Sequence, residues 1–297
     1  MTSPGYSRAE HGGERNALFL KGPGQSPGPR LIPAVTEDHV IVTTTRSPSG
    51  SLTLAAKSLA EEIGCPFSSR GRRPLDVLTE DPDRFGRIVI AEQDIRLVVE
   101  GRFFRFHPNM ARPRIRTLVQ GEVDRMIEAT GLRPGETFLD CSCGLGADAM
   151  VASHVAGQDG KVRALERSRV LASLVRYGMR MYEHPAVDLR NAMRRVTVVC
   201  ANAECILPTL ANDSWDVVYF DPMFEATFSH SKGLEVVRML AYGDVPQRET
   251  LSEAARVARR AVVVKDRAPG LLLRQLGLDR VSDSRRVLYG RIDVCKD

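Results

Sequence analysis

From Thr137 onward the chain alternates short apolar runs with stretches that have helical periodicity. The runs that predict strands are Thr137–Cys141, Val162–Glu166, Val196–Cys200, Trp215–Phe220 and Ala261–Lys265, with two closing strands near Arg280–Ser282 and Arg286–Val294. The stretches that predict helices are Gly146–Val155, Arg169–Tyr182, Cys205–Leu210 and Pro246–Arg259. A repeated strand–helix unit brings successive strands into one mostly parallel sheet with helices on both faces. The sequence therefore predicts an α/β fold built on a Rossmann-like, doubly wound sheet over residues 135–297.

Three other regions precede this part. Residues 1–37 are rich in Gly, Pro, Ser and charge, which predicts a flexible N-terminal extension. Residues 38–107 predict a smaller N-terminal α/β domain, with a strand at Val40–Thr44, a helix from near Ser51 and three short strands up to Phe106. Gly101 predicts a hairpin turn there. Residues 108–134 read as an Arg-rich bridging segment that ends in an amphipathic helix.

Composition favours a globular enzyme of the cytoplasm. Hydrophobic residues make up 43% of the chain and charged residues 27%. No run approaches the roughly 20 apolar residues of a membrane span, and the first residues lack a secretory signal pattern.

The six cysteines show no C-x-x-C spacing, which predicts buried thiols rather than a metal site. The net charge of +5 permits an acidic partner. Oligomeric state stays open.

A glycine-bearing turn follows the first strand of the main domain. Gly144 and Gly146 let the backbone pass close to a ligand, and Glu166 ends the next strand at the spacing where a carboxylate meets ribose hydroxyls. This pattern predicts a ligand that contains adenosine. Ala149 stands where the dinucleotide-binding motif has its third glycine or alanine, so NAD remains a possible ligand. A pyrophosphate, however, favours a helix N-terminus without acids. The two carboxylates near the turn, Asp140 and Asp148, therefore favour a cationic, phosphate-free ligand such as S-adenosylmethionine.

The tetrapeptide Asp221-Pro222-Met223-Phe224 follows directly on the apolar run that ends at Phe220. Ligands of open α/β sheets bind just beyond the carboxyl ends of such strands. The Asp221 carboxylate and the Pro222 carbonyl can accept hydrogen bonds from an exocyclic NH₂ group, and Phe224 offers a ring for stacking. This combination suits a nucleobase amine. The structural alternative is a turn that ends the strand, with Phe224 in the core.

Arginine is concentrated in the segment that leads to the main domain. The segment contains six arginines and only two acids, and aromatic residues lie among the arginines in the sequence. This composition is typical of surfaces that bind single-stranded nucleic acid. The arginines are Arg102, Arg105, Arg112, Arg114, Arg116 and Arg125, and the aromatic residues are Phe103, Phe104, Phe106 and His107. The alternative is a solvated charged face over a strand core. Arg112, Arg114 and Arg116 are the candidate RNA contacts, together with Lys265 at the end of the fifth strand.

Together these motifs resemble one family over about Val40 to Val294. In chain order they are Leu139-Asp140, Cys143-Gly-Leu-Gly-Ala-Asp-Ala149, Leu165-Glu-Arg167, Cys200-Ala-Asn-Ala203, Tyr219-Phe-Asp-Pro-Met-Phe224 and Val262-Val-Val-Lys265. They are similar to those of class I S-adenosylmethionine-dependent methyltransferases of the RsmJ type, which methylate guanine N2 in bacterial small-subunit rRNA. One departure is Glu225, where members of that family commonly have proline.

The resemblance implies a role for each candidate residue. Asp221, Pro222 and Phe224 would orient and stack the target base, and Asp221 would also lie near the cofactor. Asp140 and the turn containing Gly144, Gly146, Ala147 and Asp148 would hold the methionine end of S-adenosylmethionine. Glu166 with Arg167 would hold the ribose, and Asn202 with Ala203 the adenine. The expected partner is small-subunit (16S) rRNA, and the reaction needs no metal and no membrane.

Three other functions remain open from the sequence. A methyltransferase of small molecules or proteins would keep the cofactor residues and use the Arg102–Arg125 segment only as a packed connector. A non-catalytic RNA-binding protein would have a vestigial cofactor site, and the acids and glycines argue against it. An NAD-dependent oxidoreductase is the third.

Overall fold

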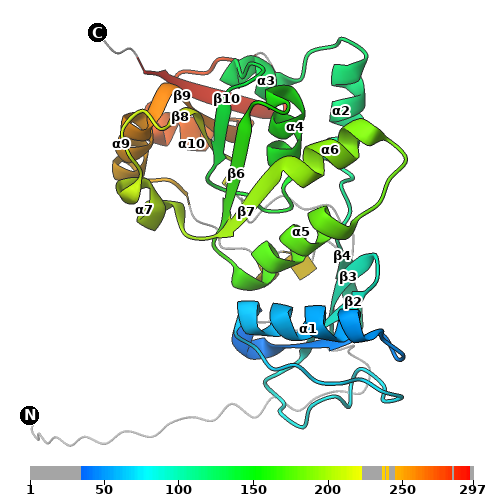
Figure 1. Cartoon of the computed structure of the whole chain (residues 1–297). Helices are drawn as coiled ribbons and strands as arrows, with labels where there is room; N and C mark the ends of the chain where they lie inside the picture. Colours follow the sequence, from blue (N-terminus) through cyan, green and yellow to red (C-terminus); the bar gives the residue numbers. More distant parts are fainter. Residues whose placement is uncertain (1–34, 223–235, 238, 241–244, 283, 295–297) are drawn as a thin grey trace, which may run out of the picture. The chain divides into compact units, whose positions relative to one another are not determined.

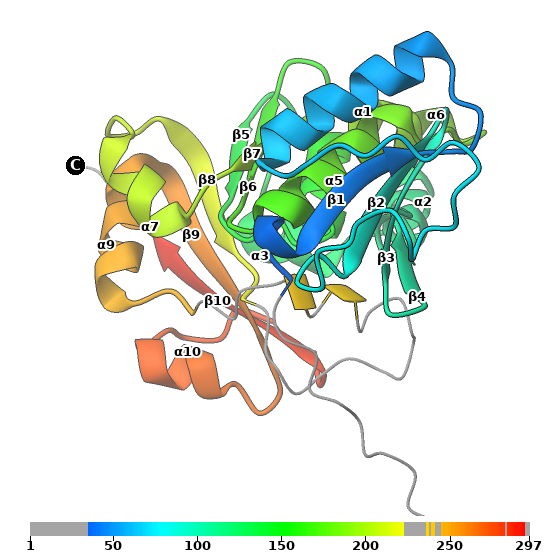
Figure 2. The same cartoon turned by 90° about the horizontal axis from the view of Figure 1, so that it is seen from below.

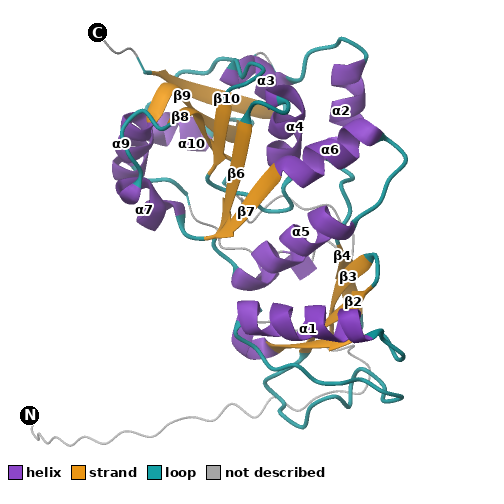
Figure 3. Cartoon of the chain, in the orientation of Figure 1, coloured by secondary structure: helices purple, strands orange, loops and turns teal. Residues whose placement is uncertain are grey.

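The computed structural model describes residues 35–294, apart from 223–235, 238, 241–244 and 283 (Figure 1). The described residues all belong to one compact unit, Pro33–Asp297. The described strands form two sheets. Four strands pair in the order β1-β2-β3-β4, and six pair in the order β10-β9-β8-β5-β6-β7. Helices and strands alternate along most of the chain, as the sequence predicts (Figure 3).

The smaller sheet has one parallel and two antiparallel pairings. Its elements are β1 (Val40–Thr44), α1 (Gly50–Ile63), β2 (Gly86–Ala91), β3 (Asp94–Val99) and β4 (Arg102–Arg105). β1 runs parallel to β2 and packs beside α1 (Figure 2), whereas β3 forms hairpins with β2 and with β4. Gly101 has a φ of 74°, which glycine adopts at little cost, so the predicted hairpin turn is confirmed.

The end of this sheet separates the three phenylalanines that the sequence grouped together. Successive side chains of a strand point to opposite faces, so Phe104 is buried whereas Phe103 is 60% exposed. Phe106, just beyond β4, is buried as well. Of the three, Phe103 is the ring that stays accessible to a partner.

Two short helices follow, where the sequence predicts only one. α2 (Ala111–Val119) buries only two of its side chains in the core, Ala111 and Ile115, which explains why its apolar pattern is weak. α3 (Arg125–Thr130) corresponds to the predicted helix. Its N-terminus is capped by Asp124, whose carboxylate accepts hydrogen bonds from the backbone N–H groups of Met126 and Ile127.

The larger sheet is parallel except at one edge. Its strands are β5 (Thr137–Asp140), β6 (Lys161–Glu166), β7 (Val196–Cys200), β8 (Trp215–Phe220), β9 (Ala258–Arg267) and β10 (Val287–Asp293). Only β10 is antiparallel to its neighbour, β9. The order places β5 beside β8, which is the point where the direction of strand progression reverses, so the predicted Rossmann-like fold class is confirmed.

Helices cover both faces of this sheet (Figure 3). They are α4 (Ala147–Ala156), α5 (Arg169–Met181), α6 (Val187–Arg195), α7 (Ala203–Ile206), α9 (Arg248–Val257) and α10 (Leu271–Leu276). α9 and α10 bury leucine and valine side chains against Leu139, Val218 and Val262 on one face. Phe138 and Tyr219 point to the opposite face, where their rings lie 5.5 Å apart.

Besides α2, three details differ from the prediction. The sequence did not predict α6 or α10. The helix predicted at Cys205–Leu210 begins two residues earlier as α7 and continues as a 3-10 turn at Leu207–Thr209. Of the two predicted closing strands, Arg286–Val294 corresponds to β10, whereas the segment at Arg280–Ser282 forms only an isolated bridge between Arg280 and Gly290.

Trp215 begins β8 and is 3% exposed. The Lys161 ammonium and the Arg163 guanidinium lie over its ring, at 5.2 and 5.5 Å from the ring centre. Such cation–π contacts stabilise charge beside a buried ring.

None of the helices in the described part of the chain has the length and hydrophobicity that a membrane span requires.

Candidate cofactor pocket and charge network

A pocket opens at the carboxyl ends of β5, β6 and β8, where the strand order reverses. It encloses about 660 Å³ of space, a volume that includes the solvent at its open mouth. The lining residues are Cys141, Ser142, Gly144, Leu165, Glu166, Arg167, Ala201, Asn202, Ala203, Glu204, Phe220, Asp221, Pro222, Val245, Pro246 and Thr250. The pocket therefore brings together the ends of strands that are far apart in the sequence.

Glu166 ties two of the loops around this pocket together. One carboxylate oxygen accepts a hydrogen bond from the Gly144 N–H at 3.0 Å, and the other accepts one from the Ser168 N–H at 2.8 Å. Both bonds fix the orientation of an acid that lines the pocket. A carboxylate held in this way is a suitable acceptor for the two hydroxyls of a ribose.

The glycine turn needs its glycines for two reasons. Gly144 and Gly146 have φ values of 51° and 74°, in the left-handed region that side chains disfavour. A Cβ atom at Gly146 would also overlap the methyl group of Met179 in α5. Of the predicted turn residues Gly144, Gly146, Ala147 and Asp148, Gly144 lines the pocket and the other three lie outside its lining.

Asp140 lies beneath the turn rather than in the pocket wall. Its side chain is 1% exposed, and its carboxyl group accepts a hydrogen bond from the Ser142 N–H at 2.9 Å. Burial raises the pKa of Asp140 to about 8, with a smaller opposing effect of the Ser142 bond. In this position Asp140 supports the loop, so a direct contact with the methionine end of a ligand stays a prediction.

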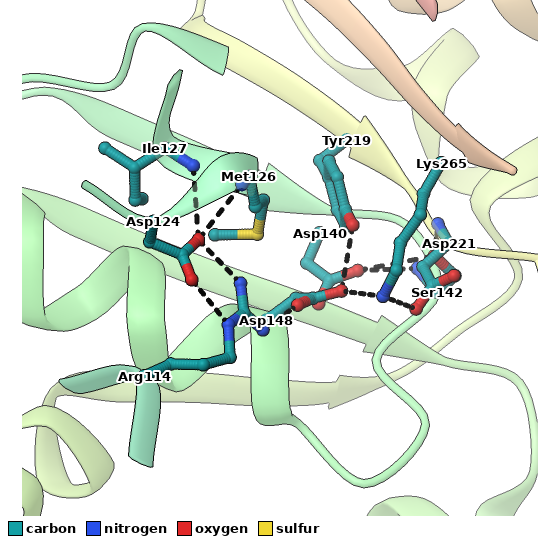
Figure 4. Close-up of polar contacts among 10 residues, drawn as sticks. All are labelled: Arg114, Asp124, Met126, Ile127, Asp140, Ser142, Asp148, Tyr219, Asp221 and Lys265. Atoms are coloured by element: carbon teal, nitrogen blue, oxygen red, sulfur yellow. Dashed lines mark hydrogen bonds and ion pairs between the residues drawn. The ribbon is translucent and has the colours of Figure 1, made fainter. Parts of the chain in front are cut away.

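Five alternating charges form a chain of ion pairs that ends at the pocket residue Asp221 (Figure 4). The Lys265 ammonium lies 2.7 Å from an Asp221 oxygen and 2.9 Å from an Asp148 oxygen. The other Asp148 oxygen accepts a short hydrogen bond from Arg114. Arg114 also forms a bidentate pair with the capping residue Asp124, at 2.7 and 2.8 Å. Each cation is thus shared by two carboxylates.

The charges in this network determine one another. Burial alone would raise the pKa of Asp148, but Lys265 and Arg114 hold it well below its usual range. Burial opposes the charge of Lys265, yet Asp148 and Asp221 raise the pKa of its ammonium well above its usual value. Burial raises the pKa of Asp221 to about 6, although Lys265 opposes this increase. The charge of Asp221 therefore changes within about one pH unit of neutral pH.

Asp221 is also the network residue that reaches the pocket. Its side chain is 35% exposed and lines the wall beside Pro222. Its backbone N–H donates a short hydrogen bond to the hydroxyl of Ser142, and the Ser142 N–H in turn donates to Asp140. Ser142 thus connects the loop after β5 to the loop after β8. Ser142 is not among the residues predicted from the sequence, although its place between Asp140 and Gly144 was a usable signal.

The remaining predicted site residues lie in several places. Arg167, Asn202 and Ala203 line the pocket, and the Asn202 side chain accepts from the Glu204 N–H at 3.0 Å, which caps α7. Arg112 and Arg116 are exposed on α2. The arginine between them points into the charge network, as does Lys265, so contacts of Arg114 and Lys265 with RNA stay predictions. Phe224 lies outside the described residues.

Within the described residues, no group of three or more His, Cys, Asp or Glu side chains is arranged to hold a metal ion. Cys141 and Cys143 lie near Asp140. Burial, with a smaller contribution from Asp140, raises the pKa of both thiols well above the usual value. Both side chains are therefore protonated thiols at neutral pH.

Comparison with protein families gives a match over residues 100–289. The matching family is described as "Putative SAM-dependent methyltransferase", where SAM denotes S-adenosylmethionine. This match covers the last strand of the smaller sheet, the bridging helices and almost all of the larger sheet.

Two relatives cover most of the chain. The chain is 36% identical over 241 residues to "Uncharacterized protein YpiP" of Bacillus subtilis, a match that spans 80% of this chain and 93% of that protein. It is 30% identical over 241 residues to "Ribosomal RNA small subunit methyltransferase J" of Nitrosococcus oceani, a match that spans 74% of this chain and 85% of that protein.

A solved structure shows the same fold. It is a SAM-dependent methyltransferase from Neisseria gonorrhoeae, with a TM-score of 0.55 and 16% sequence identity. The similarity covers 86% of this chain and 96% of that chain. At this level of identity, the agreement concerns the arrangement of helices and strands.

Proposed function

Since this chain belongs to the class I S-adenosylmethionine-dependent methyltransferases, we propose that it methylates an exocyclic amine of small-subunit ribosomal RNA in the cytoplasm, with guanine N2 as the target. The cofactor of this family is S-adenosylmethionine. The observation that carries the proposed target is the pair of acceptors after β8, Asp221 and Pro222, in the wall of the pocket. The relatives named as ribosomal RNA small subunit methyltransferases support the choice of RNA.

The lining residues of the pocket offer a partner for each part of the cofactor. Glu166 would accept hydrogen bonds from the ribose hydroxyls, with Arg167 beside it. Asn202 and Ala203, at the start of α7, would border the adenine. Gly144, which has no side chain, would leave room for the methionine end. When bound, S-adenosylmethionine supplies an electrophilic methyl group on its sulfonium.

Asp221 and Pro222 would act on the target amine. The nitrogen lone pair of such an amine is delocalised into the base, so the amine must be oriented and the charge that develops on nitrogen must be stabilised. The Asp221 carboxylate and the Pro222 carbonyl are both acceptors without a competing N–H donor. The new N–C bond would replace the bond from the methyl group to sulfur, which would leave a neutral thioether. The amine would then release one proton, which the Asp221 carboxylate could accept. Phe224 is predicted from the sequence to stack on the base.

The RNA would be held by residues outside the pocket. Arg112 and Arg116 are exposed on α2, and Phe103 is an exposed ring on β4. Phosphates attract the cations and unstacked bases attract the ring. The base itself must leave its stack before it can enter the pocket, which costs a few kcal/mol.

Nucleoside analysis tests this proposal. Small-subunit rRNA from cells with and without the gene would be digested and compared by mass spectrometry, and the purified protein would transfer labelled methyl groups to the rRNA that lacks the modification. We expect the label on guanine N2. Asp221→Ala is the matched inactive variant. Label on a ribose oxygen or a pyrimidine carbon, label on a protein or small molecule alone, or full transfer by the variant would contradict the proposal.

A further inference from the structure

We propose that Lys265 is a positioning residue of the methyl-transfer site, which holds the Asp221 carboxylate in its ionised, hydrogen-bond-accepting form and is itself anchored by Asp148. This inference rests on the role of Asp221 in the proposed function. The sequence suggests that Lys265 reaches the RNA. In the structure its ammonium lies between the carboxylates of Asp148 and Asp221 (Figure 4).

The backbone places Lys265 beside Asp221. β8 and β9 are parallel, and Phe220 pairs with Val264, so the next residue of each strand continues side by side. Lys265 also pairs with Tyr289 of β10 on its other side. Because strands flank it on both sides, the lysine stem has little freedom, and its ammonium can hold an Asp221 oxygen at 2.7 Å.

Asp148 fixes the other side of the ammonium. Its carboxylate is 6% exposed and has three donors: Lys265, Arg114 and the Tyr219 hydroxyl, which donates at 2.8 Å. An acid with three such donors stays ionised. Arg114 is in turn held by Asp124, so the anchor extends to the N-terminus of α3. The ammonium is therefore fixed before any ligand binds.

The groups around Asp221 explain why it needs a cation. Besides Lys265, the groups that interact with its charge are Asp148, Asp140 and the Tyr219 hydroxyl. Burial and the charge of Asp148 disfavour a negative charge at Asp221, whereas Asp140, whose raised pKa leaves it mostly protonated at neutral pH, adds little. In the described part of the network, Lys265 is the cation in direct contact with Asp221. Without that contact Asp221 would take up a proton near neutral pH. A protonated carboxyl group can neither offset the positive charge that develops on the amine nor take up the proton that the amine releases.

Kinetics over a range of pH test the proposal. Lys265→Met removes the charge but keeps the length, Lys265→Arg keeps the charge, and Lys57→Met is the matched control on the exposed face of α1. Methyl transfer to rRNA would be measured from about pH 5.5 to 9. We expect Lys265→Met to lower kcat about tenfold or more at pH 7 and to move the acidic limb of the profile to higher pH. KM for S-adenosylmethionine should change little, and Lys265→Arg should keep most of the activity.

A second readout does not depend on activity. The carboxyl carbon of Asp221 would be titrated by ¹³C NMR, with Asp221→Asn used for assignment. Lys265→Met should raise the titration midpoint by about one unit or more, whereas Asp148→Asn should lower it because a neighbouring negative charge is lost. The two variants thus have opposite expected signs. If one of them does not fold, the other carries the test.

The outcomes separate the two proposals. If the wild-type protein transfers no methyl group to rRNA, the proposed function fails, and the titration still decides whether Lys265 controls the charge of Asp221. An unchanged midpoint in Lys265→Met, or wild-type kcat and an unmoved acidic limb in that variant, would overturn the positioning role. Loss of activity with an unchanged midpoint would also overturn it, because Lys265 would then act in some other way.

Discussion

Gly178 of α5 lies against the ring of Phe106 with no space for a side chain between them. A Cβ atom built at Gly178 would overlap the ring and the Cβ atom of Phe106. Alanine in a helix interior is normally favoured over glycine by about 0.5–1 kcal/mol. Here overpacking should prevail, since Phe106 is buried. We expect Gly178→Ala to lower the free energy of unfolding by about 1–3 kcal/mol, measured by denaturant titration.

Two further variants control this experiment. Gly50→Ala, at the start of α1, meets nothing within 4 Å and should leave stability unchanged or slightly higher. In the double variant Gly178→Ala/Phe106→Leu, the loss should be smaller than the sum of the single losses, because the smaller side chain makes room. Wild-type stability of Gly178→Ala would show that the helix does not pack on Phe106 in this way.

Glu166→Ala should weaken cofactor binding. A charge-assisted pair with the ribose contributes roughly 1.5–3 kcal/mol, which corresponds to about 10- to 150-fold in Kd. Calorimetry with S-adenosylhomocysteine measures this change. Glu183→Ala, an exposed acid that pairs with Arg194, is the control and should bind normally. Unchanged affinity in Glu166→Ala would remove this residue from the site, and binding of NAD alone would overturn the cofactor assignment.

Asp221→Asn keeps the shape of the side chain but loses its charge. We expect kcat to fall about 100-fold, because an oriented group that stabilises charge in the transition state is lost. Calorimetry with S-adenosylhomocysteine on the same sample should show affinity within about threefold of the wild type. A variant that loses cofactor affinity but keeps kcat would assign Asp221 to binding instead.

The arginines of α2 should separate into two classes. Arg112→Gln/Arg116→Gln should weaken RNA binding and lower its salt dependence by about 0.7 per lost contact with single-stranded RNA, with no effect on folding. Arg114→Gln should instead destabilise the fold, on the order of 3 kcal/mol, since the buried Asp148 loses a partner. Filter binding at several salt concentrations and denaturant titration measure the two effects. An unaltered salt slope in the double variant would exclude α2 from the RNA contact.

Asp140 makes stability depend on pH. Its pKa is about 8 in the folded chain, well above the value of about 3.9 for an unfolded aspartate. A carboxyl group whose pKa is raised by folding stabilises the fold fully below its unfolded pKa, and this contribution is lost as pH rises towards 8. Relative to the wild type, Asp140→Asn should therefore gain stability between about pH 4 and 8. Parallel curves of the unfolding free energy for the two proteins over that range would contradict this assignment.

Strand positions could be predicted from the sequence because each buried strand is a short apolar run. Glu166 and Asp221 follow such runs directly, so their meeting at one edge of the sheet also follows from the sequence. Helices α2, α6 and α10 have few buried side chains or span only six to nine residues, which is too short for a helical period to stand out. Their absence from the sequence prediction has this physical cause.

The partners of the charged side chains could not be predicted. Lys265 and Arg114 both fit a surface that binds phosphates, and their residue types give no indication of where the side chains point. Their contacts with Asp148 depend on how α2, α4 and β9 approach one another, and these elements are separated by up to about 150 residues. Only the assembled fold shows that two of the predicted RNA contacts face inward.

Trp215 gives the protein a built-in optical probe. It is the single tryptophan among 297 residues, and it lies at the start of β8, whereas Asp221 follows the end of the same strand. Its fluorescence therefore responds to the integrity of the central sheet and to the two cations over its ring. Events in the pocket take place at the opposite end of the strand. Fluorescence emission from Trp215 can therefore report unfolding in the same sample in which calorimetry measures ligand binding.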